Sequence, residues 1–336
     1  MSSTKEQLIT ALKNHPDGFI SSERLSDTLN ISLDTVRKHL DVLEKDGYII
    51  KVNEEANYLL GAKSIETSQT AIAKGLNTEW LGKTIIHKEI TDSTQRDVRD
   101  AAKEGKSHGT VVIDNAQTNS KGRMGRVWHS SKGKGIWMSI LLKPKITPQK
   151  ATLLTLVTAT VLADVFSDIK SLRIKWPNDI LIGDKKIAGI LTEMQMEKGQ
   201  IQYIALGIGI NVNQTTEDMP EDIREMATSL QIETNHFWNM NTLIQDILQV
   251  LEQRYIDFME NGFTSIKQKW EENGYRIGES IRINVPDEQY EAIFLGIDDD
   301  GALLVLHDGT EKKLYSAEID WFNNKGRKKE DDQNKA

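Results

Sequence analysis

The stretch "SSERLSDTLNISLDTVRKHLDVLEKDG", Ser21 to Gly47, predicts two short helices joined by a tight turn. The first begins after serines suited to a helix N-cap, carries Leu25 and Leu29 one turn apart, and ends near Asn30. The second helix follows at once and ends at Gly47, a residue typical of helix C-termini. Its apolar face consists of Val36, Leu40 and Leu43.

The flanking sequence extends this pair to a winged helix-turn-helix. Leu8 and Leu12 lie at helical spacing before it, and "YIIKVNEEANYLLG", Tyr48 to Gly61, predicts two strands around a polar turn. In this arrangement the second helix of the pair enters the major groove of DNA. The candidate DNA-binding residues are Ser22, Leu33, Asp34, Thr35, Arg37 and Lys38.

The charge of this block is unusual for a DNA-binding domain. Residues 1–60 hold seven Lys and Arg against ten Asp and Glu, a balance of −3. Since phosphate contacts usually dominate DNA affinity, we expect DNA binding to require a dimer, which doubles the contacts. A winged helix that contacts proteins instead is the alternative.

Composition limits the classes of function. The 336-residue chain carries a net charge of −8 and no cysteine, which excludes disulfides, thiol catalysis and thiolate metal sites and is compatible with a reducing cytoplasm. The N-terminus lacks the apolar core of a signal peptide. The least polar long run, Leu153 to Phe166, is interrupted by polar residues and predicts a core helix rather than a membrane span. We therefore expect a cytoplasmic protein without membrane contacts.

Changes in pattern divide the chain into five parts. The winged helix covers residues 1–62, and a polar linker with some helix covers 63–82. Alternating strand-like and helix-like runs over 83–273, including helices at 95–105, 148–168 and 240–261, predict a catalytic domain of the α+β or α/β class. Short β-type runs over 274–322 resemble an SH3-like barrel. The polar tail, 323–336, is predicted to be disordered.

A cationic, glycine-rich loop, "NSKGRMGRVWHS", spans Asn119 to Ser130. It lies in a stretch, 115–163, that has no Asp or Glu and eight bases: Lys121, Arg123, Arg126, Lys132, Lys134, Lys143, Lys145 and Lys150. Glycines allow a backbone to approach an anion, Lys and Arg can grip phosphate or carboxylate, and Trp128 offers a face on which a base can stack. An anion site is therefore predicted. The alternative is a solvated loop whose charge is balanced elsewhere in the fold.

Two further motifs carry charged residues. In "KWPND", Lys175 to Asp179, Trp176 can be a core anchor, and Asp179 can be a base, a metal ligand or a turn cap. In "KKIAGILTE", Lys185 to Glu193, apolar neighbours suggest that one of the two lysines enters a protected site and neutralises an oxyanion. Two solvated lysines are the alternative.

Two polar motifs each allow both a structural and a ligand-binding interpretation. "GIGINVN", Gly207 to Asn213, lacks the spacing of a dinucleotide-binding loop and indicates either a strand packed closely against a neighbour or an Asn that faces a ligand. "TDSTQ", Thr91 to Gln95, predicts a helix N-cap made by Asp92, Ser93 or Thr94. The same hydroxyls can bind a small polar head group.

Together and in this order, "TDST", "KGRMGRVWHS", "KWPND", "KKIAGIL" and "GIGINVN" resemble the bacterial bifunctional biotin–protein ligase and biotin-operon repressor family over about residues 4–322. The resemblance implies a winged helix, a class II synthetase-like domain and an SH3-like domain. It implies that biotin and ATP, with Mg²⁺, give biotinyl-5′-AMP. A lysine on a carrier domain of acetyl-CoA or pyruvate carboxylase then takes the biotin. The adenylate-bound protein is expected to dimerise and to repress biotin synthesis or uptake genes at operator DNA.

The resemblance also implies roles for individual residues. Lys186, Arg123 and Asp179 are the expected catalytic residues, with Asp179 the base or organiser for the acceptor lysine. The expected biotin-binding residues are Ser93, Thr94, Gln95, Gln117, Lys121, Gly122, Arg123, Lys186 and Gly189. The expected ATP- and adenylate-binding residues are Arg123, Arg126, Trp128, His129, Lys186 and Asn211. No resident metal site is expected in the protein itself.

Two positions depart from the family pattern, and two other functions remain possible. The usual Gly-Arg-Gly-Arg start of the loop reads Ser120-Lys121-Gly122-Arg123 here. Lysine lacks the bidentate fork of arginine, so we expect retained activity with faster release of the adenylate. The alternatives are a lipoate–protein ligase, which shares the catalytic fold, and a transcription factor that senses biotin or a nucleotide without turnover.

Overall fold

The computed structural model describes residues 4–15, 18–45, 48–53, 55, 57–63, 67–285 and 288–321. Three predicted features, the helix stop at Gly47, part of the linker and the tail 323–336, lie outside the described residues. No described helix is both long and apolar enough to span a membrane.

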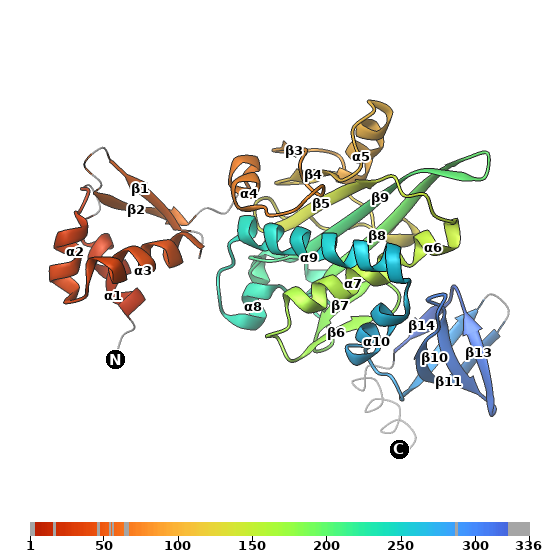
Figure 1. Cartoon of the computed structure of the whole chain (residues 1–336). Coiled ribbons are helices and arrows are strands. Elements are labelled where there is room, and N and C mark those ends of the chain that lie inside the picture. The colour runs from red at the N-terminus through yellow and green to blue at the C-terminus, as the bar shows by residue number, and fades with distance from the viewer. Residues whose placement is uncertain are drawn as a thin grey trace, which may run out of the picture.

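The N-terminal domain has the predicted order of elements (Figure 1). It contains α1 (Thr4–Lys13), α2 (Ser22–Leu29), α3 (Leu33–Lys45), β1 (Tyr48–Val52) and β2 (Tyr58–Lys63). The hydroxyl of Ser21 accepts a hydrogen bond from the Arg24 N–H and caps α2, and Asn30 ends that helix in a left-handed conformation. Leu8, Leu25 and Val36 are fully buried in a small core of its own.

From Thr67 onward the predicted linker is packed structure. Helix α4 (Gln69–Gly75) places Ile72 in the main core, and Leu81 joins the same core. The buried carboxylate of Glu252 accepts backbone hydrogen bonds from Glu79, Trp80 and Leu81. The expectation of a polar linker fails here because these few apolar residues pack against the central domain.

The central domain is built on one seven-stranded sheet. Its strands are β3 (Ile85–Lys88), β4 (Thr110–Asp114), β5 (Gly135–Leu142), β6 (Leu172–Lys175), β7 (Asp179–Ile182), β8 (Lys185–Glu197) and β9 (Gln200–Asn211). The order across the sheet is β3-β4-β5-β9-β8-β7-β6. Only β3 and β4 are parallel; the other neighbours are antiparallel.

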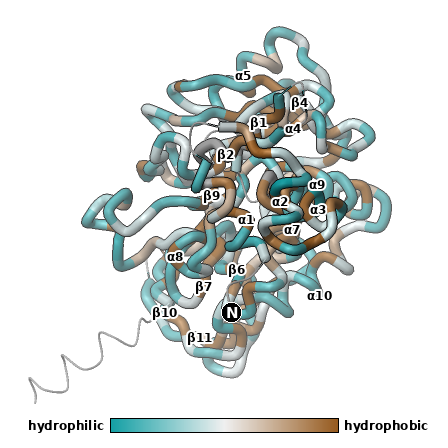
Figure 2. The backbone as a smooth tube through the Cα atoms, turned by 90° about the vertical axis from the view of Figure 1, so that its left-hand side faces the viewer, coloured by the Kyte–Doolittle hydropathy of each residue, from teal (hydrophilic) through white to brown (hydrophobic). Residues whose placement is uncertain are grey.

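Helices cover both faces of this sheet (Figure 1). One face packs against α7 (Leu154–Val165) and α9 (Met240–Asn261), and the other against α5 (Thr94–Lys103). The predicted helix 148–168 is divided into α6 (Pro148–Thr152) and α7, whereas α9 has the predicted bounds. Two more helices, α8 (Leu230–Thr234) and α10 (Thr264–Glu272), complete the domain. In Figure 2 the hydrophobic stretches lie mainly inside, and the outer loops are mostly hydrophilic.

The C-terminal domain is a five-stranded antiparallel sheet in the order β13-β12-β11-β10-β14. Its strands are β10 (Ser280–Val285), β11 (Glu288–Ile297), β12 (Leu303–His307), β13 (Thr310–Leu314) and β14 (Glu318–Asp320). Its buried face joins the core of the central domain through Phe294 and Trp321. As a result β14 lies beside the central sheet rather than apart from it.

A buried carboxyl lies at the end of β4. Asp114 is fully buried, and neither of its carboxylate oxygens has a hydrogen-bond partner among the described residues. Burial raises the pKa of Asp114 to about 7; the nearby negative charge of Asp97 adds to this shift and Lys88 opposes it. The folded protein therefore holds a proton there at pH values where the unfolded chain has released it.

We predict that Asp114 makes the protein less stable as the pH rises. Between the ordinary carboxyl pKa of 3.8 and about 7 the folded state binds more protons than the unfolded state, so the free energy of unfolding falls through this window. Replacing Asp114→Asn removes that fall. Urea unfolding at about pH 4 and about pH 8 should show a stabilisation of the variant that is larger at the higher pH. An equal effect at both values would contradict the raised pKa.

Candidate active site

A cavity with a volume of about 750 Å³ opens beside β7, β8 and β9. Its walls come from the start of α5, from the loop that contains Lys121–His129, and from the C-terminal domain at Glu318–Trp321. A cavity of this size can hold a ligand as large as a nucleotide with a second small molecule. Fourteen of the predicted site residues line it: Ser93, Thr94, Gln95, Gln117, Lys121, Gly122, Arg123, Arg126, Trp128, His129, Asp179, Lys186, Gly189 and Asn211.

The cationic loop forms a compact hairpin in this structure. Lys121 and Val127 form an antiparallel bridge, and the Gly122 N–H donates to the Arg126 carbonyl at 2.8 Å. A tight turn at its tip places Met124 at φ 55° and Gly125 at φ 73°. Left-handed backbone is unfavourable for Met, and its side chain is 77% exposed. The turn points the two arginines toward the cavity while the tip faces solvent.

Ser120, one of the two departures from the family pattern, anchors the base of this hairpin. It is buried, and its hydroxyl donates to the Trp128 carbonyl at 2.7 Å and lies 3.0 Å from the hydroxyl of Ser130. The Trp128 N–H in turn donates to the Ser120 carbonyl at 3.1 Å. A glycine at this position would lack the side-chain contacts.

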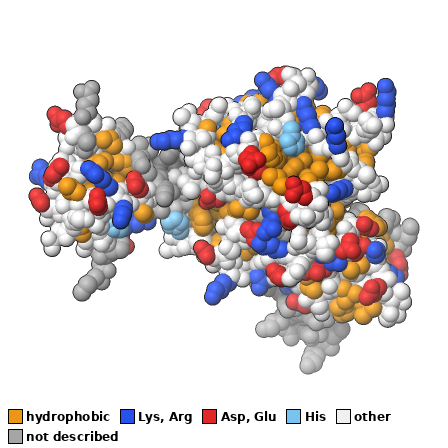
Figure 3. All heavy atoms as spheres, viewed as in Figure 1, with side chains coloured by type: hydrophobic (Ala, Val, Ile, Leu, Met, Phe, Trp, Pro, Cys, Tyr) orange, Lys and Arg blue, Asp and Glu red, His pale blue; other side chains and the backbone are white. Residues whose placement is uncertain are grey.

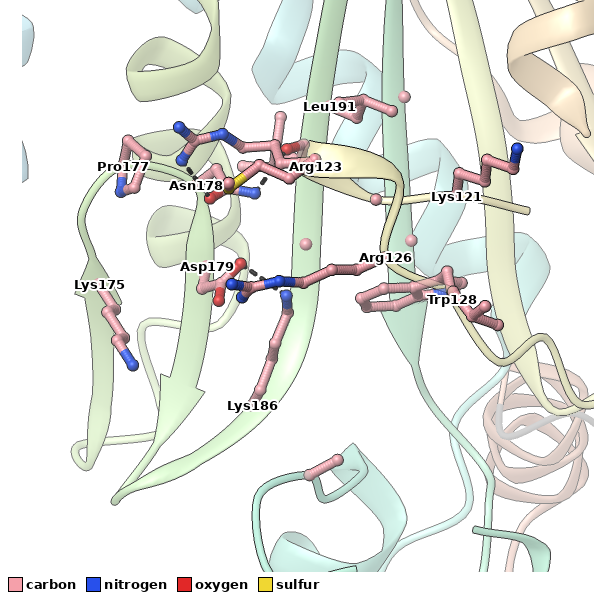
Figure 4. Close-up of a pocket in the computed structure, with 18 of the residues that line it drawn as sticks. Lys121, Arg123, Arg126, Trp128, Lys175, Pro177, Asn178, Asp179, Lys186 and Leu191 are labelled. Carbon is pink, nitrogen blue, oxygen red and sulfur yellow. Dashed lines mark hydrogen bonds and ion pairs between the residues drawn. The ribbon is translucent and has the colours of Figure 1, made fainter. Parts of the chain in front are cut away.

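The two arginines contact different walls of the cavity. Arg123 donates to the side-chain oxygen of Asn178 at 3.2 Å (Figure 4). Arg126 lies 3.4 Å from a carboxylate oxygen of Glu318 on β14. The Arg126 contact is exposed, so it adds little to stability. Both guanidinium groups thus lie at the mouth of the cavity, where an anion can replace a weak partner.

Lys186 lies at the centre of the cavity wall. Its ammonium is 2.6 Å from a carboxylate oxygen of Asp179 and 5.1 Å from the centre of the Trp128 ring (Figure 4). The pairing of β7 with β8 is irregular, because its register shifts between Ile180 and Leu181. This shift brings the Lys186 and Asp179 side chains together. Of the two adjacent lysines, Lys186 enters the cavity, whereas Lys185 extends toward the carbonyl of Arg224.

Glycines on β8 and β9 leave room for the rings and amides of the site. A Cβ at Gly209 would lie 2.9 Å from the indole of Trp128, and one at Gly189 would lie 3.0 Å from it. A Cβ at Gly207 would lie 3.1 Å from the Gln95 amide. Close strand packing, one of the two interpretations of "GIGINVN", therefore applies to these glycines.

Hydroxyl and amide groups form the opposite end of the cavity. The Thr94 hydroxyl lies 2.7 Å from that of Ser139, and the Thr94 N–H donates to the side-chain oxygen of Gln117 at 2.9 Å. Ser93 occupies the N-cap position of α5, but its hydroxyl makes no capping bond. The prediction of a side-chain cap is wrong for Ser93 because Gln117, from the neighbouring chain segment, already accepts the first helical N–H.

The amide of Asn211 is engaged within the protein. It donates to the Thr228 carbonyl at 3.0 Å and accepts from Gln214 at 3.1 Å. Asn211 thus holds the chain after β9 in place, in addition to lining the cavity. His129 is an exposed residue at the rim.

The eight bases of the acid-free stretch divide into two groups. Lys121, Arg123 and Arg126 line the cavity. Of the others, Lys134 pairs with Asp218 at 2.5 Å and Lys132 lies 4.0 Å from Glu89. Three of these bases therefore face the cavity, where the anion site stays a prediction, and two lie beside carboxylates elsewhere in the fold.

The sequence reasoning assigned no role to Lys175, which also lines the cavity. Burial lowers its pKa, and the charge of Asp179 acts in the opposite direction. The register of β6 and β7 pairs Lys175 with Asp179. An alternating pattern along "RIKWPND" could have revealed that both residues face the same side of the sheet.

The candidate DNA-binding residues lie at the start of α2 and along α3. Leu33, Asp34, Arg37 and Lys38 are exposed on α3, whereas Ser22 is only 7% exposed and is the member least able to reach DNA. On this domain's face in Figure 3, Lys and Arg side chains lie among Asp and Glu. The face in this view therefore carries mixed charge rather than a basic patch.

Comparison with known proteins finds a matching family for three parts of the chain. Residues 88–211 match the biotin/lipoate A/B protein ligase family, residues 277–321 the biotin protein ligase C-terminal domain, and residues 4–56 an HTH domain. The bifunctional ligase/repressor BirA of Bacillus subtilis is 39% identical over 321 residues, covering 95% of this chain and 99% of the relative. The Escherichia coli protein of the same description is 29% identical and covers 93% and 95%.

A solved structure shows the same fold. The biotin protein ligase from Aquifex aeolicus, in complex with biotin and ATP, superposes with a TM-score of 0.60 at 29% identity, covering 71% of this chain and 98% of that protein. The chain belongs to the family of bifunctional ligase/repressor proteins. The predicted family and the predicted three-part fold class are confirmed.

We predict that Ser120 limits opening of the hairpin loop. Replacing Ser120→Ala removes both side-chain contacts at its base, so backbone amides of residues 121–128 should exchange with solvent faster, on the order of tenfold. Ser131→Ala, in the next turn of chain, is the matched control and should leave these amides unchanged. Hydrogen exchange followed by mass spectrometry measures both, and equal exchange in the Ser120 variant and the parent would contradict the anchor.

Proposed function

We propose that the protein uses ATP to convert biotin to biotinyl-5′-AMP and transfers the biotin to a lysine of a biotin carrier domain. One observation carries this proposal: a lysine and two arginines converge on a cavity whose far end is neutral and polar. Joining a carboxylate to a phosphate requires cations because the two reactants repel each other. The arrangement offers cations at one end and hydrogen-bonding groups for a polar head group at the other.

In the first step, an oxygen of the biotin carboxylate attacks the α-phosphorus of ATP, and pyrophosphate leaves. Lys186 is placed between the two anions and stabilises the charge of both as the bond forms. Arg123 and Arg126 bind phosphate oxygens in exchange for their present partners, Asn178 and Glu318. Trp128 covers the adenine, and Thr94, Gln117 and Ser93 bind the head group.

The expected Mg²⁺ fits this donor set as an ion that accompanies the nucleotide. The described residues contain no cluster of three or more His, Asp and Glu side chains that could hold a metal, whereas Asp179 and Asp184 line the cavity singly. In such sites Mg²⁺ is held by phosphates and one or two carboxylates. It would supply charge neutralisation at the phosphates.

In the second step, the amine of the acceptor lysine attacks the acyl carbon and AMP leaves. Asp179 is suited to orient the amine and to accept its proton, since its carboxylate lies at the cavity wall 2.6 Å from Lys186. The Lys186 charge then stabilises the departing phosphate. Lys186 therefore contributes to both steps with one side chain.

A lipoate ligase shares the family fold, but the head-group end favours biotin. Thr94, Gln117 and Ser139 offer hydroxyl and amide groups there. These groups match the urea-type N–H and C=O groups of biotin better than the apolar dithiolane ring of lipoate. All the BirA relatives and the Aquifex aeolicus structure compared above carry biotin-ligase or ligase/repressor descriptions.

We also propose that the adenylate-bound protein dimerises through β8 and represses genes of biotin synthesis or uptake at operator DNA. β7 pairs with β8 only as far as Gly189, while β9 continues to pair with it to Glu197. The outer edge of residues 191–197 therefore has no strand partner in the described part of the chain. An open edge can pair with its copy in a second molecule. Doubling the winged helix would double the phosphate contacts that its net acidic charge limits.

We predict that Lys186→Met abolishes biotin-dependent ATP–pyrophosphate exchange. The loss should be at least about a hundredfold in kcat, since the substitution removes a charge that acts on the transition state. Lys185→Met changes the same residue type one position away and should retain exchange. Lipoate in place of biotin tests the rival ligase. Unchanged exchange in the Lys186 variant would refute its assignment, and no exchange in the folded parent would favour a sensor without turnover.

We predict that biotin and ATP together promote dimerisation through the open edge of β8. Sedimentation should show concentration-dependent association only with both ligands, and amides of residues 191–197 should exchange more slowly in the dimer. Association that protects other residues and leaves these amides unchanged would contradict this interface.

A further inference from the structure

The backbone of Lys186 is held by a segment far away in the sequence. β9 pairs with β8 only from Ala188 onward, because β9 ends at Asn211. At Lys186 residues 226–228 take the place of β9: the Lys186 N–H donates to the Met226 carbonyl at 2.8 Å, and the Thr228 N–H donates to the Lys186 carbonyl at 2.9 Å. These two bonds satisfy both backbone groups of Lys186. We call residues 215–229 the clamp segment.

The clamp segment is fixed firmly at its C-terminal end. Thr228 and Ser229 are buried, and the Thr228 carbonyl accepts from the Asn211 amide at 3.0 Å. The Ser229 hydroxyl donates to the Gln214 carbonyl at 2.7 Å and caps α8 through the Ile232 N–H. In contrast, residues 221, 222 and 224–226 in the middle are exposed.

An ion pair fixes the N-terminal end. The Lys134 ammonium lies 2.5 Å from both carboxylate oxygens of Asp218, and the Lys134 carbonyl accepts from the Asn213 N–H at 2.6 Å. Asp218 also accepts from the backbone and hydroxyl of Thr215. Burial opposes ionisation of Asp218, but the hydrogen bonds from Lys134 and Thr215 outweigh it and lower the pKa. Neither Lys134 nor Asp218 lines the cavity.

We infer that Lys134 and Asp218 are positioning residues for adenylation. Their ion pair holds the clamp segment in register, and the clamp segment holds the backbone of Lys186 so that its ammonium stays beside Asp179. Successive turns connect Asp218 to the residues that bond the Lys186 backbone. In these turns the Ile223 N–H donates to the Pro220 carbonyl, and the Ala227 N–H donates to the Ile223 carbonyl. This inference rests on the proposed function, in which Lys186 acts on the transition state.

The position of Lys186 matters more for turnover than for binding. A displacement of about 1 Å at a group that acts on the transition state can lower the rate by about a hundredfold. At the head-group end of the cavity, the side-chain hydrogen bonds of Thr94 and Gln117 within the described part of the chain join them to each other, to Ser139 and to Ser130, and not to the clamp segment. Loss of the ion pair should therefore lower kcat and leave the KM for biotin nearly unchanged.

The test compares Lys134→Met, Asp218→Asn and the charge-reversed pair Lys134→Asp with Asp218→Lys. Lys132→Met is the control. Lys132 lies in the same loop as Lys134, but its ammonium lies 4.0 Å from a carboxylate oxygen of Glu89, whereas Asp218 pairs with Lys134. In biotin-dependent ATP–pyrophosphate exchange, each single variant should lose about tenfold in kcat with the KM for biotin within about twofold. The reversed pair should recover part of the loss, because it restores the ion pair, whereas a lysine at position 218 cannot accept the hydrogen bonds from Thr215.

Amide hydrogen exchange supplies a readout that does not require activity. The N–H groups of Lys186 and Thr228 should exchange faster in both single variants, and return toward the parent rate in the reversed pair. If the parent has no biotin-dependent exchange, the proposed function fails, while the amide rates still test the clamp. Unchanged exchange rates of the Lys186 and Thr228 amides in the single variants would overturn the inference. A loss of kcat no larger than that of the Lys132 variant would also overturn it, as would a loss that only follows a lower folded fraction.

Discussion

The ion pair of Lys186 with Asp179 is the contact on which the rest of the site depends. Two opposite charges lie 2.6 Å apart at the cavity wall, where both side chains are only partly exposed to solvent. The shifted register between β7 and β8 brings the two side chains together, and Trp128 lies over the ammonium. A Cβ at Gly209 would displace that ring, and a Cβ at Gly189 would make a tight contact with it.

The fold was largely predictable where local pattern and packing agree. The helices of the N-terminal domain follow from serine caps and apolar faces, and α9 follows from its long periodic pattern. Local pattern failed at 67–82, because Ile72 and Leu81 are single apolar residues whose burial depends on α9 and Glu252, far away in sequence. Periodicity cannot reveal such a partner.

The site was predictable in its residues but not in its contacts. The resemblance identified Lys186, Arg123 and Trp128, and the structure brings them into one cavity. It did not reveal that Asn211 is engaged by Thr228 and Gln214, or that Lys175 faces the same cavity. These features arise from the register of β6 with β7 and from the path of the chain after β9. Both are properties of tertiary packing, and no short motif encodes them.

The central claim is that a carboxylate oxygen of biotin attacks the α-phosphorus of ATP in this cavity before the acyl group reaches the acceptor. The most direct measurement uses biotin labelled with ¹⁸O in both carboxylate oxygens, one turnover with a carrier domain, and mass spectrometry of the AMP. The account predicts one ¹⁸O in each AMP, since that oxygen stays with phosphorus when the amide forms. AMP without label, alongside biotinylated carrier, would contradict the proposed acyl-adenylate route.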